Sequence, residues 1–200
     1  MAMQCVDVYD FDGTIYRGDS TVDFLIYLAG KRKSLLLRAV FLIPAAVRLL
    51  FTGDLTRFKS SLFNQIAGRV DLFAEGERFW RESGAQQKIN GWFRKRPVDV
   101  PVIIASASPE FELRWIAKEL GADDLICTRC DEKTGKLIGQ NCKSDEKIRR
   151  IREKYGDVSI RSMYTDSIRA DRPLLELAEN RFLVNAKTGE VRPLLPEELR

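Results

Sequence analysis

The stretch from Val6 to Thr14, VDVYDFDGT, constrains the fold more than any other part of the sequence. The apolar run Cys5 to Tyr9 favours a short strand, because there is no room for a helix before the glycine that follows. Two carboxylates, Asp10 and Asp12, stand one residue apart at the end of that strand. Side chains two residues apart on an extended chain share a face, so both carboxylates can converge on one point. Carboxylate oxygens are the ligands that a hard cation such as Mg²⁺ prefers, and open α/β sheets place their active sites at this edge.

Taken alone, the two aspartates fit an acidic surface turn equally well, because Asp and Gly are common in turns. An EF-hand loop fits poorly. If Asp10 is its first position, the last ligand position falls on Thr21 instead of the required glutamate. The choice between a surface turn and an active site therefore depends on residues further along the chain.

The chain contains no histidine, which excludes Ser-His-Asp and Cys-His catalysis and leaves acid–base chemistry to carboxylates or lysines. Its four cysteines include the C-x-x-C pair Cys127 and Cys130, followed by Cys142. A zinc site is disfavoured, because Cys5 falls in the first predicted strand and no histidine can complete the ligand set. With no signal peptide before that strand, we expect reduced thiols and a cytoplasmic protein.

From residue 98 onward, apolar runs alternate with helical patterns. The run Val100 to Ala105 is continuous, which is typical of a strand buried on both faces of a parallel sheet. Alternating strands and helices predict right-handed crossovers, so the expected fold class is α/β, a Rossmann-like three-layer parallel sheet. The predicted strands are 5–9, 100–105, 124–128, 159–164 and 181–184; the predicted helices are 110–120, 144–155 and 173–179; a hairpin is expected at 130–139 and a polar surface tail at 185–200.

Residues 16–97 interrupt this pattern, and we predict that they form an all-helical insert, with 1–15 and 98–200 as the core. The expected helices cover 20–30, 34–51, 55–66 and 71–96, and Gly84 and Gly91 are expected to divide the last of these. The insert carries 15 Lys and Arg against 7 Asp and Glu, whereas the rest of the chain has 18 against 22. This positive excess fits either an anionic partner or a solvated basic face.

The most apolar part of the insert, Ser34 to Phe51, follows the three cations Lys31 to Lys33. It is too short and too interrupted for a membrane span, and Pro44 is expected to kink it. The favoured interpretation is a buried helical hairpin of the insert. The alternative is a membrane-interface element, in which apolar residues enter the lipid and basic residues meet anionic head groups.

Six polar residues follow predicted strands or open predicted helices, so the fold can bring them to one edge of the sheet. They are Asp10 and Asp12 after the first strand, Ser106 after the second, Lys143 before a helix, and Asp166 and Asp171 after the fourth strand. This order, D-x-D-G-T, then Ser, Lys and D-x-x-x-x-D, resembles the haloacid dehalogenase-like (HAD) superfamily of phosphoryl-transfer enzymes over essentially the whole chain. A helical insert after the first motif resembles the type C1 cap of its subfamily IB, the phosphoserine phosphatase-like group.

The resemblance implies catalytic roles for the first two aspartates. Asp10 would be the nucleophile that attacks phosphorus to give an aspartyl-phosphate. Asp12 would protonate the leaving alcohol and then activate water. Dehalogenases of the family expel halide and lack this second aspartate, so its presence implies phosphate-ester chemistry.

The resemblance also implies a Mg²⁺ site and a phosphate site. Asp10, the backbone carbonyl of Asp12 and Asp166 would hold the cation. Ser106 and Lys143 would hold the phosphoryl oxygens, and the lysine would counter the developing charge.

Three further residues would support the site: Asp171, which would orient Lys143 or a metal-bound water, Thr14 and Ala107. Two positions stay open. Ser108 competes with Ser106, and Lys147 competes with Lys143, although Lys143 matches the usual family position better. The fourth motif has Thr165 where the family usually has Gly.

The resemblance gives two indications of the substrate. Asp19 falls where serine-phosphate hydrolases carry a Glu that reads the substrate ammonium, so it is the candidate specificity residue, although its side chain is shorter. The apolar and basic stretch Lys31 to Phe51, and the fourth motif TDSIRADRPLL, are similar to HAD-type bacterial phosphatidylglycerophosphatases.

We therefore expect a Mg²⁺-dependent phosphatase that hydrolyses a phosphate monoester, most readily of a small soluble metabolite. The alternative is a lipid-phosphate phosphatase at the inner face of the membrane, and a third is a non-catalytic protein that binds a phosphorylated ligand. No motif indicates a nucleic-acid partner.

Overall fold

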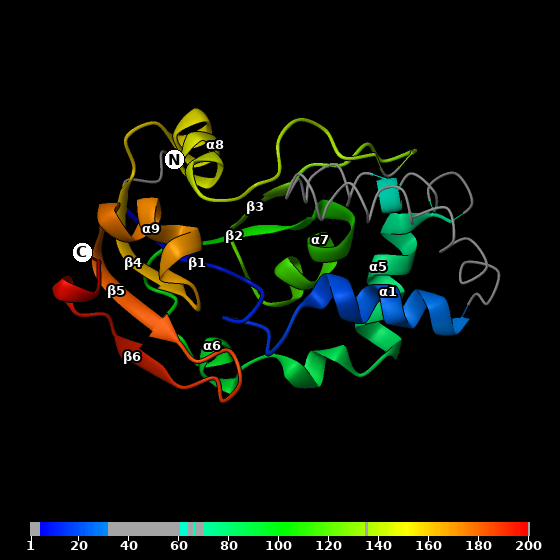
Figure 1. The fold of residues 1–200 in the computed structure, drawn as a ribbon, viewed down its shortest axis with the longest axis horizontal. Coiled ribbons are helices and arrows are strands. Elements are labelled where there is room, and N and C mark those ends of the chain that lie inside the picture. Colours follow the sequence, from blue (N-terminus) through cyan, green and yellow to red (C-terminus); the bar gives the residue numbers. More distant parts are fainter. Residues whose placement is uncertain (1–4, 32–60, 64–65, 67–69, 135, 200) are drawn as a thin grey trace, which may run out of the picture.

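The computed structural model describes residues 5–31, 61–63, 66, 70–134 and 136–199 (Figure 1). The expected helix 34–51 lies outside the described residues. Most of the expected helix 55–66 also lies outside them. Of the stretch Lys31 to Phe51 only Lys31 is described, so membrane contact by this stretch stays a prediction. No helix within the described ranges combines the length and the apolarity that crossing a bilayer requires.

A sheet in the order β3-β2-β1-β4-β5-β6 forms the centre of the described chain. Its strands are β1 (Cys5–Tyr9), β2 (Val102–Pro109), β3 (Asp124–Thr128), β4 (Ser159–Thr165), β5 (Ala178–Val184) and β6 (Val191–Pro193). The first five run parallel, and β6 pairs antiparallel to β5. Because β1 lies between β2 and β4, the residues that follow these three strands meet at one edge.

Both faces of the sheet are buried, because its strands alternate between two apolar cores. In β2, Val102 and Ile104 enter one core, whereas Ile103 and Ala105 enter the other. The first core is covered by α6 (Gly91–Arg94) and α7 (Glu110–Glu119), and the second by α8 (Asp145–Tyr155) and α9 (Ile168–Leu177). The predicted three-layer α/β architecture is confirmed (Figure 1).

The described part of the insert consists mainly of helices, namely α1 (Ser20–Lys31), α5 (Leu72–Glu82), a 3-10 helix (Ala85–Lys88) and α6. Of these, α1 and α5 lie at the end of the molecule far from β5 and β6, whereas α6 lies near β6 (Figure 1). The segment expected at 71–96 is divided at Gly84, as expected, whereas Gly91 is the first residue of α6. Gly84 has a φ of 77°, in the left-handed region that favours glycine.

The chain enters and leaves the insert on neighbouring segments. The Asn90 backbone N–H donates to Ile15 O at 2.9 Å, and the Arg17 N–H donates to Lys88 O at 3.0 Å. The Asn90 side-chain amide also donates to Thr14 O at 2.7 Å. The domain boundaries at residues 16 and 97 remain a prediction.

Two elements near the C-terminal end differ from expectation. The last core helix was expected at 173–179, but α9 begins at Ile168 and β5 begins at Ala178. The Ser167 hydroxyl accepts from the Ala170 N–H and caps the helix well before Pro173. The tail was expected to be a surface wrap, yet residues 191–193 form β6, because pairing satisfies the outer edge of β5.

Candidate active site

The carboxyl ends of β1, β2 and β4 carry the motif residues. Asp10 directly follows β1, and its backbone N–H donates to Tyr164 O of β4 at 2.9 Å. Ser106 lies in the last half of β2, and Asp166 directly follows β4. The parallel order β2-β1-β4 therefore brings three of the four motifs to one edge of the sheet.

A buried lysine joins the first motif to the fourth. Lys147 Nζ lies 2.8 Å from Asp10 Oδ1 and 2.7 Å from Asp171 Oδ1, and the lysine side chain is 3% exposed. The Thr165 hydroxyl donates to Asp171 Oδ2 at 2.8 Å. Burial acts to lower the pKa of Lys147, but the charges of Asp10 and Asp171 raise it overall. The ammonium therefore stays charged, and Asp171 holds it on Asp10.

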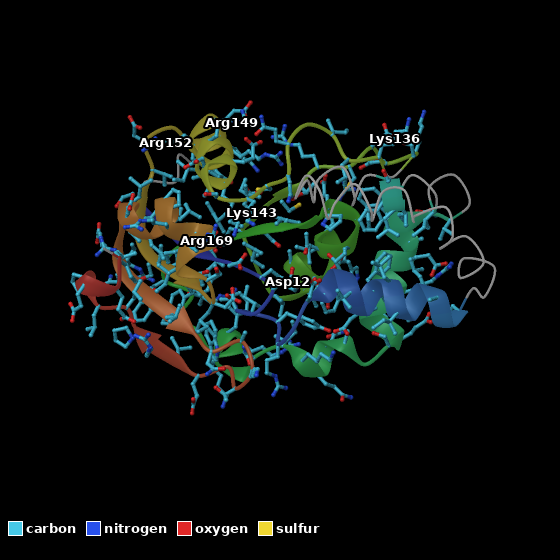
Figure 2. All side chains as sticks on the ribbon, viewed as in Figure 1. Asp12, Lys136, Lys143, Arg149, Arg152 and Arg169 are labelled. Carbon is cyan, nitrogen blue, oxygen red and sulfur yellow. The ribbon has the colours of Figure 1, made fainter. Side chains whose placement is uncertain are left out.

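The sequence preferred Lys143 over Lys147 as the lysine that binds phosphate, and that choice remains a prediction, but the contacts with Asp10 and Asp171 are made by Lys147. Lys143 is exposed ahead of α8 and makes no side-chain hydrogen bond or ion pair with the described residues. Because α8 begins at Asp145, its buried face carries Lys147, whereas Arg149 and Arg152 lie on its outer side (Figure 2). Because the two lysines are four residues apart, helical periodicity alone does not separate them; the start of α8 at Asp145, after Lys143, does.

The Asp12 carboxylate is held by two donors. The Ser20 backbone N–H at the start of α1 donates to Asp12 Oδ1 at 2.6 Å. The Ser108 hydroxyl donates to Asp12 Oδ2 at 2.5 Å. Burial raises the pKa of Asp12, and the bonds from Ser108 and Ser20 oppose that rise. Both carboxylate oxygens therefore accept hydrogen bonds, one of them from the insert.

Ser106 and Ser108 share the end of β2 but contact different groups. Ser106 is buried, and its Oγ accepts the Ser108 backbone N–H at 3.0 Å. Ser108 therefore contacts the Asp12 carboxylate, whereas Ser106 contacts the backbone of Ser108. The expected phosphate contact of Ser106 remains a prediction.

The supporting residues Thr14 and Ala107 have structural contacts. Thr14 is fully buried, its carbonyl accepts the Asn90 amide at 2.7 Å, and its hydroxyl has no hydrogen-bond partner within the described ranges. The Ala107 carbonyl accepts the Thr128 hydroxyl at 2.8 Å. These bonds fix the loops after β1 and β2.

Asp19 makes no hydrogen bond to these residues, but its charge adds to the rise in the pKa of Asp12. Its side chain is exposed, and Oδ1 accepts the Val22 backbone N–H at 3.0 Å, so it caps the first turn of α1. Its expected role in reading a substrate group remains a prediction.

The donor set at this edge fits a hard divalent cation. Burial raises the pKa of Asp10 to about 7, and that of Asp166 also rises, with nearby carboxylates adding to both effects. Gly13 has a φ of 73°, and a Cβ there would lie 2.3 Å from Asp166 Oδ2, so this carboxylate is packed against the backbone that carries the Asp12 carbonyl. A divalent cation would relieve the repulsion between these groups.

No group of three or more His, Cys, Asp or Glu side chains in the described parts of the chain is spaced to hold a metal ion. The expected ligand set is different in kind, since it combines the side chains of Asp10 and Asp166 with one backbone carbonyl. Oxygen donors of this kind suit Mg²⁺.

Glu112 is a polar residue near the site that the sequence did not reveal. It is fully buried in α7, and its Oε2 is hydrogen-bonded to the Thr21 hydroxyl at 2.9 Å. Burial, together with the charge of Asp12, raises the pKa of Glu112 to about 8. A glutamate in the first turn of a helix is ordinary, because it complements the helix dipole, so the sequence carried no signal of its burial.

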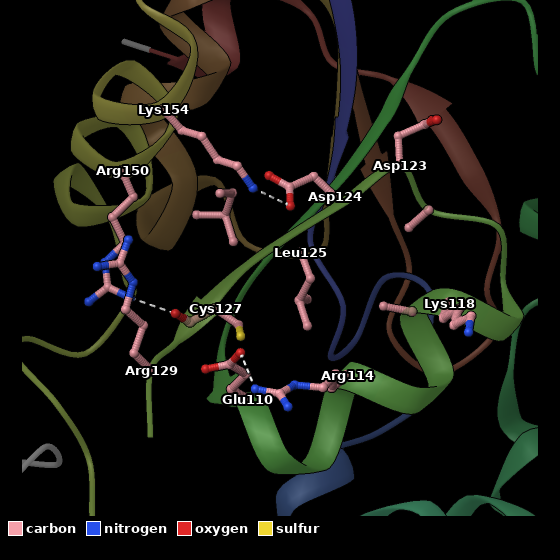
Figure 3. A pocket seen from close by; sticks show the side chains of 13 residues that line it. Glu110, Arg114, Lys118, Asp123, Asp124, Leu125, Cys127, Arg129, Arg150 and Lys154 are labelled. Atoms are coloured by element: carbon pink, nitrogen blue, oxygen red, sulfur yellow. Dashed lines mark hydrogen bonds and ion pairs between the residues drawn. The ribbon is translucent and has the colours of Figure 1, made fainter. Parts of the chain in front are cut away.

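A cavity of about 530 Å³ lies elsewhere, along β3 between α7 and α8 (Figure 3). Two cations that line it are already paired, Arg114 with Glu110 and Lys154 with Asp124. None of the motif residues lines this cavity. It is therefore separate from the edge that carries the carboxylates.

Comparisons with known proteins find a matching family model and a related protein. A family model described as haloacid dehalogenase-like hydrolase matches residues 8–176. The chain is also 32% identical over 186 residues to Protein CicA of Caulobacter vibrioides, a match that covers 86% of this chain and 82% of that protein.

Two solved structures illustrate the shared fold. A protein with unknown function from Bordetella pertussis Tohama I has a TM-score of 0.72 at 21% identity, covering 92% of this chain and 91% of that one. A phosphoserine phosphohydrolase-like protein from Francisella tularensis subsp. tularensis SCHU S4 has a TM-score of 0.57 at 15% identity, covering 90% and 86%. At these identities the similarity establishes the fold and leaves the substrate open.

Proposed function

The chain belongs to the haloacid dehalogenase-like hydrolases, and on that premise we propose that it is a Mg²⁺-dependent phosphatase that hydrolyses a phosphate monoester. The observation that carries the proposal is the contact of Lys147 with both Asp10 and Asp171, since it joins the first motif to the last at one edge of the sheet.

In the first step, an Asp10 oxygen attacks phosphorus and the bond from phosphorus to the ester oxygen breaks. Lys147 donates to Oδ1 of Asp10, so Oδ2 can be the attacking atom. Asp12 enters this step protonated, the form that burial favours, and gives its proton to the departing alkoxide, which leaves an aspartyl-phosphate on Asp10. The lysine also favours the ionised form of Asp10 against the effect of burial, which keeps the nucleophile active.

In the second step, Asp12 takes a proton from a water molecule, whose oxygen attacks the aspartyl-phosphate. Inorganic phosphate leaves and Asp10 is restored as a carboxylate. The two donors on Asp12, Ser20 N–H and Ser108 Oγ, support this role because they orient the carboxylate and favour its ionised form.

Asp10, Asp166 and the backbone carbonyl of Asp12 would hold Mg²⁺. When bound, the cation would offset the negative charge of the carboxylates and of the phosphoryl group. The crowding of Asp166 against Gly13 supports this assignment, because it fixes the carboxylate beside the carbonyl.

For the substrate we propose a small soluble phosphate ester, because described aromatic residues of the insert pack into the apolar core. Phe24, Phe79 and Trp80 are all buried there. One observation favours the second candidate, a lipid phosphate: Val22 and Ile26 are 50% and 65% exposed and lie four residues apart on α1.

The test is release of inorganic phosphate, with Mg²⁺ present, from an aryl phosphate, a panel of phosphorylated metabolites and a lipid phosphate in anionic vesicles. The wild-type protein is expected to release phosphate, and Asp10→Asn should abolish release. The matched control is Asp157→Asn, an exposed carboxylate outside the site, which should keep full activity. Undiminished turnover by the Asp10 variant would refute the proposal, and turnover of the vesicle substrate with none of the metabolites would select the lipid candidate.

A further inference from the structure

A continuous line of polar atoms runs from the Asp12 carboxylate into the interior. Ser108 Oγ lies 2.5 Å from Asp12 Oδ2, and Thr21 Oγ1 lies 3.1 Å from Ser108 Oγ. Glu112 Oε2 then lies 2.9 Å from Thr21 Oγ1. Ser108, Thr21 and Glu112 are at most 5% exposed, so solvent does not interrupt the line.

A count of hydrogens decides how these groups can be arranged. The line has three contacts, but the hydroxyls of Ser108 and Thr21 supply only two hydrogens. If both hydroxyls donate outward to the carboxyls, two oxygen atoms face each other at 3.1 Å with no hydrogen between them. All three contacts are satisfied at once only if one of the carboxyls supplies the third hydrogen.

Glu112 is the better source of that hydrogen. Asp12 already receives the Ser20 backbone N–H on its other oxygen, which favours its ionised form. The Glu112 side chain is fully buried, and its Oε1 makes no hydrogen bond of ordinary distance and angle within the described residues. The Ser20 hydroxyl lies close enough to lower the pKa of Glu112, but burial and the charge of Asp12 outweigh it. An ionised carboxylate with one unsatisfied oxygen is costly in such a place, whereas a neutral carboxyl is tolerated. The raised pKa of Glu112, caused by burial, agrees with this geometry.

We infer that Glu112 is a positioning residue: it donates a hydrogen to Thr21, which donates to Ser108, so that both hydroxyls point toward Asp12 and hold it as the acceptor that activates water. The inference rests on the proposed phosphatase function and adds a residue to its second step. The line also crosses from the core to the insert, because Thr21 belongs to α1 and Glu112 to α7.

The inference predicts a particular kinetic effect. With an aryl phosphate, the value of kcat/KM reports the steps up to loss of the aryl alcohol, where a good leaving group needs little help from an acid. Hydrolysis of the aspartyl-phosphate enters kcat alone. Loss of the line should therefore lower kcat and KM together, leave kcat/KM nearly unchanged, and produce an initial burst of aryl alcohol.

The experiment measures steady-state and burst kinetics with p-nitrophenyl phosphate and Mg²⁺. Glu112→Leu and Thr21→Val each break the line without adding bulk, and each is expected to lower kcat by about tenfold while kcat/KM stays within about twofold. Glu112→Gln can still donate to Thr21 through its amide, so it should keep kcat within about threefold of wild type. The matched control, Glu110→Gln, changes a glutamate on the same helical turn that pairs with Arg114 instead, and should behave as wild type.

Three results would overturn the inference: wild-type kcat in both line-breaking variants, an equal fall of kcat and kcat/KM, or a Glu112→Gln variant as slow as Glu112→Leu. Thermal unfolding checks that each variant is folded, and Thr21→Val decides the matter if Glu112→Leu does not fold. If the wild-type protein releases no phosphate from any ester, the proposed function itself fails. A wild-type phosphatase with an unaffected Glu112→Leu variant rejects this inference and leaves the proposed function standing.

Discussion

Replacing Lys147 by Met is the sharpest test of how the site is assembled. The side chain is 3% exposed and lies 2.8 Å from Asp10 Oδ1 and 2.7 Å from Asp171 Oδ1. The change removes the positive charge that these buried carboxylates share, and it keeps an unbranched apolar side chain. Removing one partner of a buried ion pair typically costs about 3–5 kcal/mol of folding stability, because the remaining charge is left without a partner.

The same change should lower activity strongly. Loss of a preorganised charge at a phosphoryl group typically lowers turnover by about 100-fold or more. The matched control is Lys143→Met, the same substitution four residues earlier. Because Lys143 is exposed and makes no side-chain contact with the described residues, we expect the free energy of unfolding of Lys143→Met to differ from wild type by less than about 0.5 kcal/mol. The kcat/KM of Lys143→Met should fall far less than that of Lys147→Met.

Two measurements on both variants check this prediction. Urea unfolding gives the change in the free energy of unfolding, and hydrolysis of p-nitrophenyl phosphate with Mg²⁺ gives kcat/KM. The reasoning is refuted if Lys143→Met loses activity as severely as Lys147→Met, or if Lys147→Met is as stable and active as wild type.

Three further predictions follow from contacts at the site. Gly13→Ala should abolish Mg²⁺-dependent activity, because the added Cβ would lie 2.3 Å from a carboxylate oxygen of Asp166. The control is Gly139→Ala, where φ is a similar 72° but the added Cβ meets open space, so only backbone strain of about 1 kcal/mol is expected. Activity assays and urea unfolding of the two variants check this prediction. Asp171→Asn should lower kcat by releasing Lys147 from its position, and equal kcat in variant and wild type would count against that role. In the folded protein the pKa of Glu112 is about 8, above its ordinary value of 4.5, so the folded state keeps a proton that the unfolded state loses. Wild-type stability should therefore fall as the pH rises between these values, by about 1.4 kcal/mol per pH unit from this group. Thermal unfolding of Glu112→Gln should lack that part of the slope, and parallel curves for the two proteins would contradict the prediction.

The parts of the fold that depend on local pattern could be predicted from the sequence. The apolar run ahead of Asp10 gave β1, and the strand at 124–128 was located correctly, because buried parallel strands are continuous apolar runs bounded by polar turns. The approach of Asp10 to β4 could also be expected from the order of strands and motifs.

The contacts that depend on register and burial could not be predicted in the same way. The choice between Lys143 and Lys147 depends on where α8 begins, because Lys143 precedes the helix and Lys147 lies on its buried face. The role of Ser108 depends on the path of the chain after Ser106. The burial of Glu112 results from the packing of distant segments, since the Trp80 indole N–H donates to the Glu112 backbone carbonyl at 2.6 Å. Likewise, β6 forms because the outer edge of β5 needs a partner, which local composition does not record.

The most direct test of the account is to find where phosphate is bound during turnover. The wild-type protein would be mixed with ³²P-labelled p-nitrophenyl phosphate and Mg²⁺, quenched in acid within one turnover, digested and mapped by mass spectrometry. The account predicts an acid-stable, base-labile label on the peptide that carries Asp10, and no label in the Asp10→Asn variant. Phosphate release without any labelled peptide, or a label on a different residue, would contradict it.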